Sequence, residues 1–358
     1  MKPCDIGGQG VLEGVMMRSK EEAALAVRKQ NGEITTSRWK LKKQREGFFK
    51  WPVVRGCVNL VDMLMEGTRV ISDSAKMFDE NTADEQPSKL EKAIAKKTGK
   101  SEMDVMMGVA VVLALVLAVG LFFLLPSFLV GLVSKHIESN FLVCLIEGGI
   151  RIVILMGYML FCTSVKDVKR VFMYHGAEHK TIACYENELP LTVENVRPQR
   201  RLHPRCGTSY LLLVMIVSIL VYSVVGAVFS ALGFHGIDKN LLFRVCSRLI
   251  LLPLIAGISY EVLKGAAKHE NWFTKAIRWP GMQLQRLTTK EPDDSMIEIA
   301  IIAFEMALRD KNDEEIEALV AEFDRSEKPA EEKSDAPEET EEENSTPEET
   351  EENANNEE

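Results

Sequence analysis

Four long apolar segments constrain the fold of this chain more than any other feature. A helix needs about 20 consecutive, mostly apolar residues to cross a bilayer, because backbone polar groups find no water in the hydrocarbon core. Four segments meet this requirement: Val105–Val133, Phe141–Thr163, Tyr210–Leu232 and Phe243–Leu263. The sequence therefore predicts an α-helical membrane protein with a domain of four transmembrane helices in residues 105–263.

The distribution of lysine and arginine predicts how these helices are oriented. Basic residues near the ends of a span favour the cytoplasmic side. Segments 89–104, 164–209 and 264–280 hold 17 lysines and arginines. The connections on the other side of the membrane hold four, even when the start of the fourth span is included. We therefore expect a multi-pass protein of the cell membrane, with both termini and the loop 164–209 in the cytoplasm.

The first 80 residues have the pattern of a small cytoplasmic α+β module. Two strand-like segments, Ala23–Lys29 and Glu33–Leu41, flank Asn31-Gly32, a strong hairpin signal because both turn positions must tolerate positive φ. A helix is expected over Arg55–Met77, where apolar residues recur at helical spacing. Residues 81–104 are expected to be a charged linker.

A glycine-rich segment, Gly7–Arg18 (GGQGVLEGVMMR), precedes the hairpin. Its four glycines permit tight turns or a close approach of the backbone to a ligand. It lacks the Gly-Lys-Ser/Thr of a P-loop and the spacing of the dinucleotide fingerprint. We interpret it as a strand with turns and bulges, while a contribution of Glu13 or Arg18 to a site stays open.

The segment after the last span, residues 264–325, is expected to be cytoplasmic and helical. Pro292 followed by Asp293 and Asp294 is typical of a helix start, since a carboxylate can cap the free amides. Ile297–Phe323 then has the composition of one or two amphipathic helices.

Negative charge is concentrated at the end of the chain. Residues 326–358 hold 15 acidic residues, two lysines and no large apolar side chain, which predicts a disordered acidic tail. The whole chain has a net charge of -10, so residues 1–325 carry +3. The excess of acidic residues in the whole chain therefore does not predict the partners of the folded part. We expect the lipid bilayer and a cytoplasmic protein as partners and predict no nucleic acid; the oligomeric state stays open.

Ionisable residues inside the predicted spans need a structural or functional reason. Glu147 lies one helical turn from Arg151 and at the same depth as Arg248, so a structural ion pair with either arginine is favoured over a proton or ion path. Glu261, near the inner end of the fourth span, could line a cavity or pair with Arg205. Both interpretations of Glu261 remain open.

The chemistry-bearing residues are concentrated in the loop 164–209. On a helix that continues from the second span, His175 and His179 share one face and can direct their imidazoles at one ion. Glu178 is close enough to orient a bound water. The order His-x-x-Glu-His is the inverted zincin pattern, in which the glutamate is the general base. The same pattern also fits two interfacial histidines beside a salt-bridging glutamate.

A metal ion needs further ligands, and the same loop offers two. His203 and Cys206 supply a nitrogen and a thiolate three residues apart. Nitrogen and sulfur donors favour zinc over magnesium or calcium. If all four groups bind, the site is closed and structural; if Cys206 stays out, a water can take the fourth position.

Four segments give the chain a family resemblance. The chain resembles the YqhQ-type family of bacterial membrane proteins in GGQGVLEGVMMR, YHGAEHKTIACYE, LTVENVRPQRRLHPRCGTSY and LQRLTTKEPDD. That family has a domain of unknown function and is labelled a predicted metal-dependent enzyme. The resemblance extends over roughly residues 4–308 and implies a bacterial inner-membrane location. It also implies a metal site at His175, Glu178, His179, His203 and Cys206, and it supplies no substrate.

Three functions are consistent with these residues. The first is a zinc-dependent hydrolase that acts at the cytoplasmic face on a lipid-borne or peptide substrate, with His175, His179 and His203 as ligands and Glu178 as the base. The second is a non-enzymatic scaffold or regulatory protein, whose structural metal site helps to recruit a cytoplasmic partner. The third is a transporter, which is disfavoured because few polar residues lie inside the spans.

Overall fold

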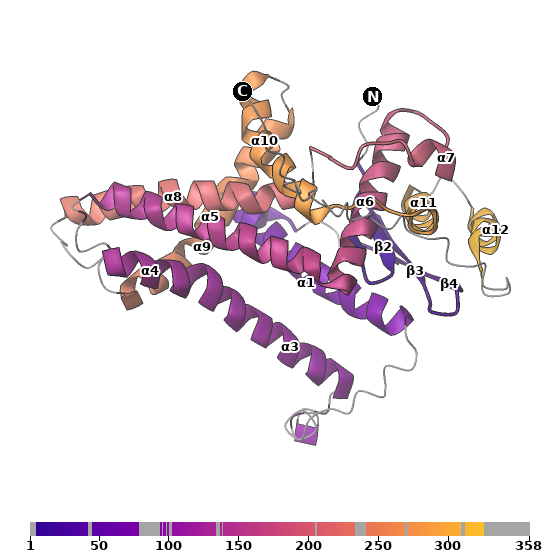
Figure 1. Ribbon diagram of the computed structural model, residues 1–358, viewed down its shortest axis with the longest axis horizontal. Helices are drawn as coiled ribbons and strands as arrows, with labels where there is room; N and C mark the ends of the chain where they lie inside the picture. Colours follow the sequence, from indigo (N-terminus) through magenta and orange to yellow (C-terminus); the bar gives the residue numbers. More distant parts are fainter. Residues whose placement is uncertain are drawn as a thin grey trace, which may run out of the picture.

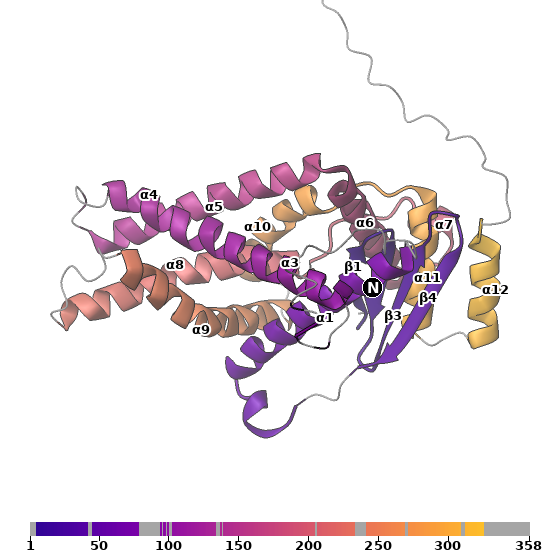
Figure 2. The same cartoon turned by 90° about the horizontal axis from the view of Figure 1, so that it is seen from below.

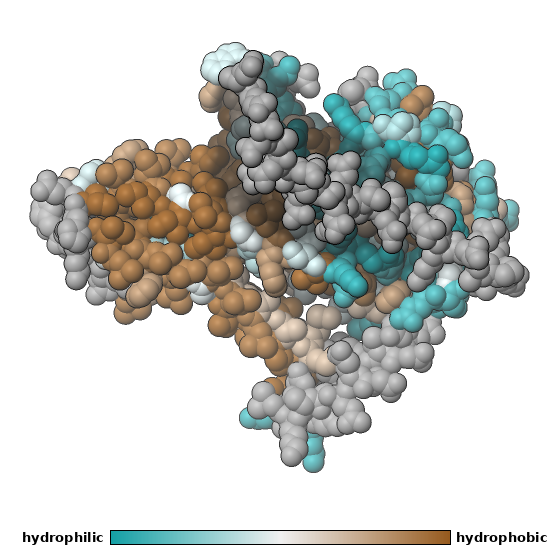
Figure 3. Space-filling view, in the orientation of Figure 1, coloured by the Kyte–Doolittle hydropathy of each residue, from teal (hydrophilic) through white to brown (hydrophobic). Residues whose placement is uncertain are grey.

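The structure is a bundle of long helices with a small β-sheet at one end (Figure 1). This computed structural model describes residues 5–41, 45–78, 94, 96–97, 99, 102–133, 137, 139–204, 206–232, 241–268, 271–308 and 312–325. Apolar surface gathers over the bundle, and hydrophilic surface gathers over the end that carries the sheet (Figure 3). The predicted acidic tail, and nearly all of the predicted linker before residue 102, lie outside the described residues.

The four expected apolar helices are present, and each is long enough to cross a membrane. The first consists of α3 (Glu102–Val119), a π-helical turn η3 (Gly120–Leu124) and α4 (Leu125–Val133). The others are α5 (Asn140–Ser164), α8 (Thr208–Ala231) and α9 (Leu241–Lys268). Their length and composition suggest a membrane protein.

The first of these helices diverges from the others along its α3 half. Figure 1 shows α3 running away from α9 and α1 (Val54–Phe78), whereas α4 rejoins the bundle. The most apolar stretch of this helix has no buried residue, while more than a third of the corresponding stretch of α9 is buried. One side of α9 and α1 is therefore left uncovered by α3.

A buried ion-pair network joins three of the apolar helices. Arg248 of α9 binds both carboxylate oxygens of Glu147 on α5, and Arg151 Nη2 lies 3.5 Å from the same carboxylate. The Ser127 hydroxyl of α4 donates to Glu147 at 2.8 Å. The expected structural ion pair is confirmed, and it includes both arginines.

The N-terminal module contains a four-stranded antiparallel sheet in the order β1-β2-β3-β4 (Figure 2). The strands are β1 (Gly7–Val11), β2 (Gly14–Arg18), β3 (Glu22–Arg28) and β4 (Ile34–Lys40). The predicted hairpin around Gly32, which has a φ of +90°, is confirmed. The predicted helix is α1, and a 3-10 turn η1 (Gly47–Lys50) precedes it.

Both faces of the sheet are buried, because successive strand residues point to opposite sides. Val15, Met17, Ala24 and Ala26 face the core shared with α6 (Lys166–Glu186) and α11 (Asp294–Leu308). The alternate residues of the strands pack in a second core with Val70 of α1. A helix from the central loop and a helix from the C-terminal segment thus complete the N-terminal module.

The C-terminal segment differs in part from the expected one or two amphipathic helices. It contains α10 (Trp272–Thr288), α11 and α12 (Asp313–Phe323), and Asp293 caps α11 as predicted, with Oδ1 accepting from the Met296 amide at 2.9 Å. However, every residue of Met296–Ala307 is buried, so the prediction of an amphipathic helix was wrong for α11. The sheet, α6 and α12 pack around α11, and the buried Glu298 of this helix forms ion pairs with Arg28 and Arg325.

Replacing Glu147 with alanine should strongly destabilise the bundle. The change leaves Arg248 and Arg151 buried without their carboxylate, and breaking a buried pair in this way costs about 3–5 kcal/mol. The thermal unfolding midpoint of the detergent-solubilised protein measures the effect. The exposed Glu317→Ala substitution is the matched control and should leave the midpoint unchanged; equal midpoints for both variants would contradict the network.

Candidate metal centre

The centre is built on α6, which is a separate helix. Val165, with φ -82° and ψ 122°, ends α5 and begins α6. The expectation that the histidine helix continues from the second span was therefore wrong, because an extended residue interrupts the helical hydrogen bonds. The chain can turn there and lay α6 against the sheet. From Tyr174 to Cys184 all residues except His175 are buried, and His175 is nearly so.

Two backbone carbonyls fix the ring orientation of the histidines on α6. His175 Nδ1 lies 2.9 Å from the carbonyl oxygen of Thr288, and His179 Nδ1 is hydrogen-bonded to that of Arg201. A carbonyl oxygen can only accept, so each neutral ring carries its proton on Nδ1 and leaves Nε2 as a bare lone pair. This is the usual arrangement of histidines that bind a metal through Nε2.

Cys206 completes a group of three metal-ligand candidates. One ligand atom each from His175, His179 and Cys206 lies within 4.8 Å of the others. Cys206 Sγ is 3.4 Å from His175 Nε2. A tetrahedral zinc ion with Zn–N of about 2.1 Å and Zn–S of about 2.3 Å would hold such atoms about 3.6 Å apart. The donor types are those of zinc sites, and the separation of Cys206 Sγ from His175 Nε2 is close to this distance.

His203 lies beside this group and is not one of its members. Its ring centroid is 5.7 Å from that of His179, and its Nε2 lies 3.4 Å from a carboxylate oxygen of Glu186. Among the residues that the structure describes, the group thus includes three of the four donors expected from the sequence, without His203. Three protein donors leave one position of a tetrahedral ion open.

Glu178 directs a carboxylate oxygen at both histidines. Its Oε2 lies 3.6 Å from His175 Nε2 and 3.6 Å from His179 Nε2, and it has no hydrogen-bond partner among the described residues. Burial raises the pKa of the Glu178 carboxyl, although the Gly8 amide donates a hydrogen bond to it. The Glu178 carboxyl therefore takes up a proton more readily than an exposed glutamate does.

The convergence of these atoms is the decisive feature of the centre. Two bare imidazole nitrogens and a sulfur face one another, and a carboxylate oxygen of Glu178 lies 3.6 Å from both nitrogens. Lone pairs that converge in a buried site repel one another unless a cation or protons lie between them. The chemistry of this donor set therefore suits a cation.

The loop that carries Cys206 is held by Gln285 of α10, which is completely buried. Its Oε1 accepts from the His203 amide at 2.9 Å, and its Nε2 donates to the His203 carbonyl at 2.8 Å and the Ser209 hydroxyl at 3.1 Å. Gln285 was not predicted as a functional residue. The signal was its position in the segment LQRLTTKEPDD, which also supplies the Thr288 carbonyl.

The rest of that segment ties the loop to α6. Glu291 forms ion pairs with the buried Lys180 of α6 and, at 3.2 Å, with Arg201. Arg197 binds both carboxylate oxygens of Asp294 at 2.8 and 2.6 Å. Gly176 lets this segment approach, because a Cβ there would lie 2.0 Å from the Lys290 carbonyl oxygen. The spacing between α6 and the segment is therefore tightly set.

The glycine-rich segment forms the hairpin of β1 and β2. This agrees with its interpretation as a strand with turns. A Cβ on Gly10 would lie 2.5 Å from the Val171 carbonyl oxygen, so this glycine allows β1 to pack against α6. Glu13, at the turn, pairs with Arg170 and accepts a hydrogen bond from the Tyr174 hydroxyl at 3.1 Å. The close approach that Gly10 permits is therefore between the backbone of β1 and α6.

Glu261 lies apart from the candidate metal ligands. Arg55 of α1 binds both of its carboxylate oxygens. Its expected alternative partner, Arg205, lies outside the described residues. The contact with Arg55 was not predicted because α1 and α9 are far apart in the sequence, and it fastens α1 to the end of α9.

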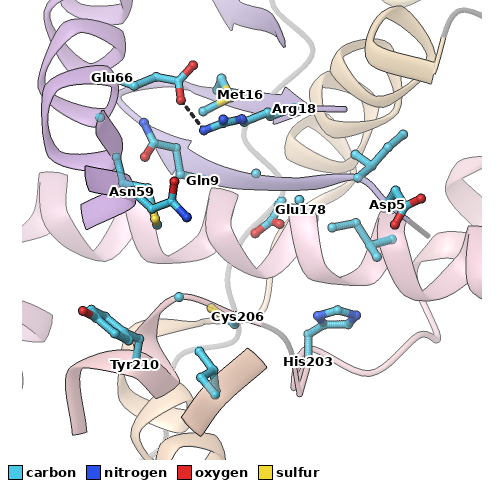
Figure 4. Close-up of a pocket in the computed structure, with 18 of the residues that line it drawn as sticks. Asp5, Gln9, Met16, Arg18, Asn59, Glu66, Glu178, His203, Cys206 and Tyr210 are labelled. Carbon is cyan, nitrogen blue, oxygen red and sulfur yellow. Dashed lines mark hydrogen bonds and ion pairs between the residues drawn. The ribbon is translucent and has the colours of Figure 1, made fainter. Parts of the chain in front are cut away.

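A cavity of about 510 Å³ opens beside the centre. Figure 4 shows Glu178, Cys206 and His203 on one side of it and Asn59, Gln9 and the Arg18–Glu66 ion pair on another. Arg18 is thus placed at the cavity, whereas the carboxylate of Glu13 is used to hold α6. The wall also includes Tyr210 of α8 and Tyr260 of α9.

The residues of the centre lie in the part of the chain that matches a known protein family. The family model described as "Protein of unknown function (DUF1385)" matches residues 51–310. The chain belongs to the DUF1385 family. It is also similar to the uncharacterized protein YqhQ of Bacillus subtilis (strain 168), with 35% identity over 312 residues that cover 86% of this chain and 93% of that protein. No solved structure matches the chain. The DUF1385 match includes all three members of the donor group and Gln285.

Replacing Gln285 with leucine should loosen the loop of Cys206. The variant loses three hydrogen bonds and leaves buried polar groups of His203 without partners, at a cost of about 1–3 kcal/mol for each group. We expect a lower unfolding midpoint and faster alkylation of Cys206, followed by peptide mass spectrometry. Alkylation of Cys246, which is exposed on α9, is the internal control. An unchanged Cys206 rate would show that Gln285 does not position the loop.

Proposed function

We propose that the protein is a zinc-dependent membrane hydrolase in which His175, His179 and Cys206 hold the metal and Glu178 is the general base. The observation that carries this proposal is the convergence of two bare Nε2 atoms and one thiol in a largely buried group, with an unpartnered carboxylate oxygen of Glu178 3.6 Å from both nitrogens. Three protein ligands and an open position are typical of catalytic zinc sites, whereas structural sites have four.

Each side chain would have a distinct task. Zinc at such a site lowers the pKa of a coordinated water to about 7 and polarises a carbonyl group. Glu178 would accept the proton of the attacking water and return it to the leaving group, a role that requires a carboxylate within hydrogen-bond reach of the water. His203, beside His179 and Glu186, would be available to bind the substrate. The cavity would hold the substrate next to Glu178.

The proposed location is the cytoplasmic face of the bacterial inner membrane. The four apolar helices would span the membrane, with both termini, the sheet and the centre on the cytoplasmic side. The excess of basic residues next to those span ends supports this orientation. A reducing cytoplasm would also keep Cys206 available as a thiolate ligand.

The alternative is a scaffold or regulatory protein with a structural metal site. Burial of the centre between α6 and the segment after α10 is consistent with a stapling role, in which the ion mainly stabilises the loop. The two functions differ in whether the ion keeps an open position and in what Glu178 does.

Metal analysis of the purified protein and three variants separates these functions. We expect about one zinc per chain in the wild type and a loss of zinc in His175→Ala and Cys206→Ser, because each removes a ligand. Glu178→Gln should retain zinc and lose hydrolysis of a panel of ester and amide substrates. His203→Ala is the matched control for ligation and should also retain zinc.

Three outcomes would change this assignment. A wild type without stoichiometric metal after gentle extraction would contradict both functions. Loss of zinc in His203→Ala would indicate a closed, four-ligand site and favour the scaffold. Zinc retained in Cys206→Ser would contradict the proposed ligand set.

Reporter fusions test the proposed orientation. Alkaline phosphatase is active only after export, so a fusion after Glu358 should be inactive and a truncated fusion after Ile137 should be active. Green fluorescent protein at the same two positions should give the reciprocal pattern. An active phosphatase at Glu358 would place the centre on the opposite side of the membrane.

A further inference from the structure

The cavity beside the centre follows α1 from the apolar bundle to the sheet. A Cβ on Gly56 would lie 2.8 Å from Tyr260 Cβ of α9, and a Cβ on Gly67 would lie 3.4 Å from the Gln9 side chain of β1. Both glycines line the cavity. They are 11 residues apart in the sequence, which corresponds to about 16 Å of helix. One cavity therefore connects a predicted membrane span with the sheet.

The lining of the cavity has apolar and polar parts. Leu60 and Met63 of α1, together with Tyr260 and Leu263 of α9, give it an apolar part. Gln9, Asn59 and the Arg18–Glu66 pair give it a polar part, next to Glu178. Gln9 Nε2 is buried and has no hydrogen-bond partner among the described residues, so a donor is available for a ligand acceptor. An amphipathic ligand matches both parts.

The apolar part is continuous with an exposed apolar surface. Met63 lines the cavity and is 54% exposed, and its neighbours Val61, Leu64 and Met65 are each more than half exposed. In water, so many exposed apolar side chains on one helix are unfavourable and mark a binding surface. The divergence of α3 leaves one side of α1 and α9 uncovered (Figure 1). Acyl chains of the surrounding bilayer would cover it.

We propose that the substrate is a lipid-borne molecule that enters the cavity sideways from the inner leaflet, with its acyl chain along Met63, Tyr260 and Leu263 and its polar group at Gln9 and Asn59. This inference rests on the proposed function and specifies its substrate class. The bond to be hydrolysed is an ester or amide between the chain and the polar group, which would lie next to Glu178. Hydrolysis adds one water across this bond and releases a carboxylate and an alcohol or amine.

Photolabelling tests the entry of an acyl chain. The probe is phosphatidylethanolamine with a diazirine in its acyl chain, added to the full-length protein in detergent. After illumination, peptide mass spectrometry should find the label on the peptides that contain Met63 and Leu263. Excess unlabelled phosphatidylethanolamine should reduce this labelling at least tenfold, whereas glycerophosphoethanolamine, which lacks acyl chains, should not. Equal competition by both compounds, or no label at these residues, would overturn the proposal.

Matched variants separate the cavity from the general lipid-facing surface. Leu60→Trp fills the cavity and should reduce labelling of Leu263 several-fold, whereas Leu64→Trp, on the exposed face of the same helix, should not. Labelling of Ile250, which is 76% exposed on α9, is the internal reference and should be equal in all proteins. Unchanged labelling of Leu263 in Leu60→Trp would overturn the proposal, and the competition experiment does not depend on how this variant folds.

The same experiment in His175→Ala distinguishes the two proposals. Labelling of the cavity needs no metal, so it should persist in this variant within twofold of the wild type. Labelling with no zinc in the wild type would support the lipid cavity and contradict the hydrolase. Zinc in the wild type with no labelling would support the metal centre and contradict entry of a lipid.

Discussion

Hydrogen bonds from two imidazole rings to the backbone determine what the candidate centre can bind. The carbonyls of Thr288 and Arg201 hold the Nδ1 protons of His175 and His179, and both Nε2 lone pairs then point into the same space as Glu178. Without these carbonyls the rings could rotate, and either nitrogen could carry the proton. Arg201 lies 22 residues after His179, and Thr288 lies 113 residues after His175, so the centre forms only when these distant segments have packed together.

Helix α6 serves the fold and the centre at the same time. One side of it packs with the sheet and α11 in the main core, and its histidines face the loop of Cys206. The glycines at Gly8, Gly10 and Gly176 allow the neighbouring backbone to approach it closely. An interior packed in this way transmits small displacements, so substitutions in the sheet core should alter the centre as well as stability.

Features that depend on local sequence could be predicted, and features that depend on tertiary contacts could not. Apolar length identified the four spans, and helical spacing identified His175 and His179 as neighbours. The burial of α11 was not predicted, because its surroundings come from distant strands. Likewise, the separation of His203 from the donor group depends on Gln285, which lies 82 residues further along the chain. Spacing alone could not distinguish His203 from Cys206 as the third donor.

Cobalt substitution would show whether His175, His179 and Cys206 bind one metal ion. Co²⁺ replaces zinc with the same ligands, and its visible spectrum reports both coordination number and sulfur ligation. We expect uptake of one Co²⁺ per chain, with the intense absorption of a four-coordinate ion and a thiolate charge-transfer band that is absent in Cys206→Ser. A weak six-coordinate spectrum without the thiolate band, or no uptake of cobalt, would contradict the claim that these donors converge on a metal ion.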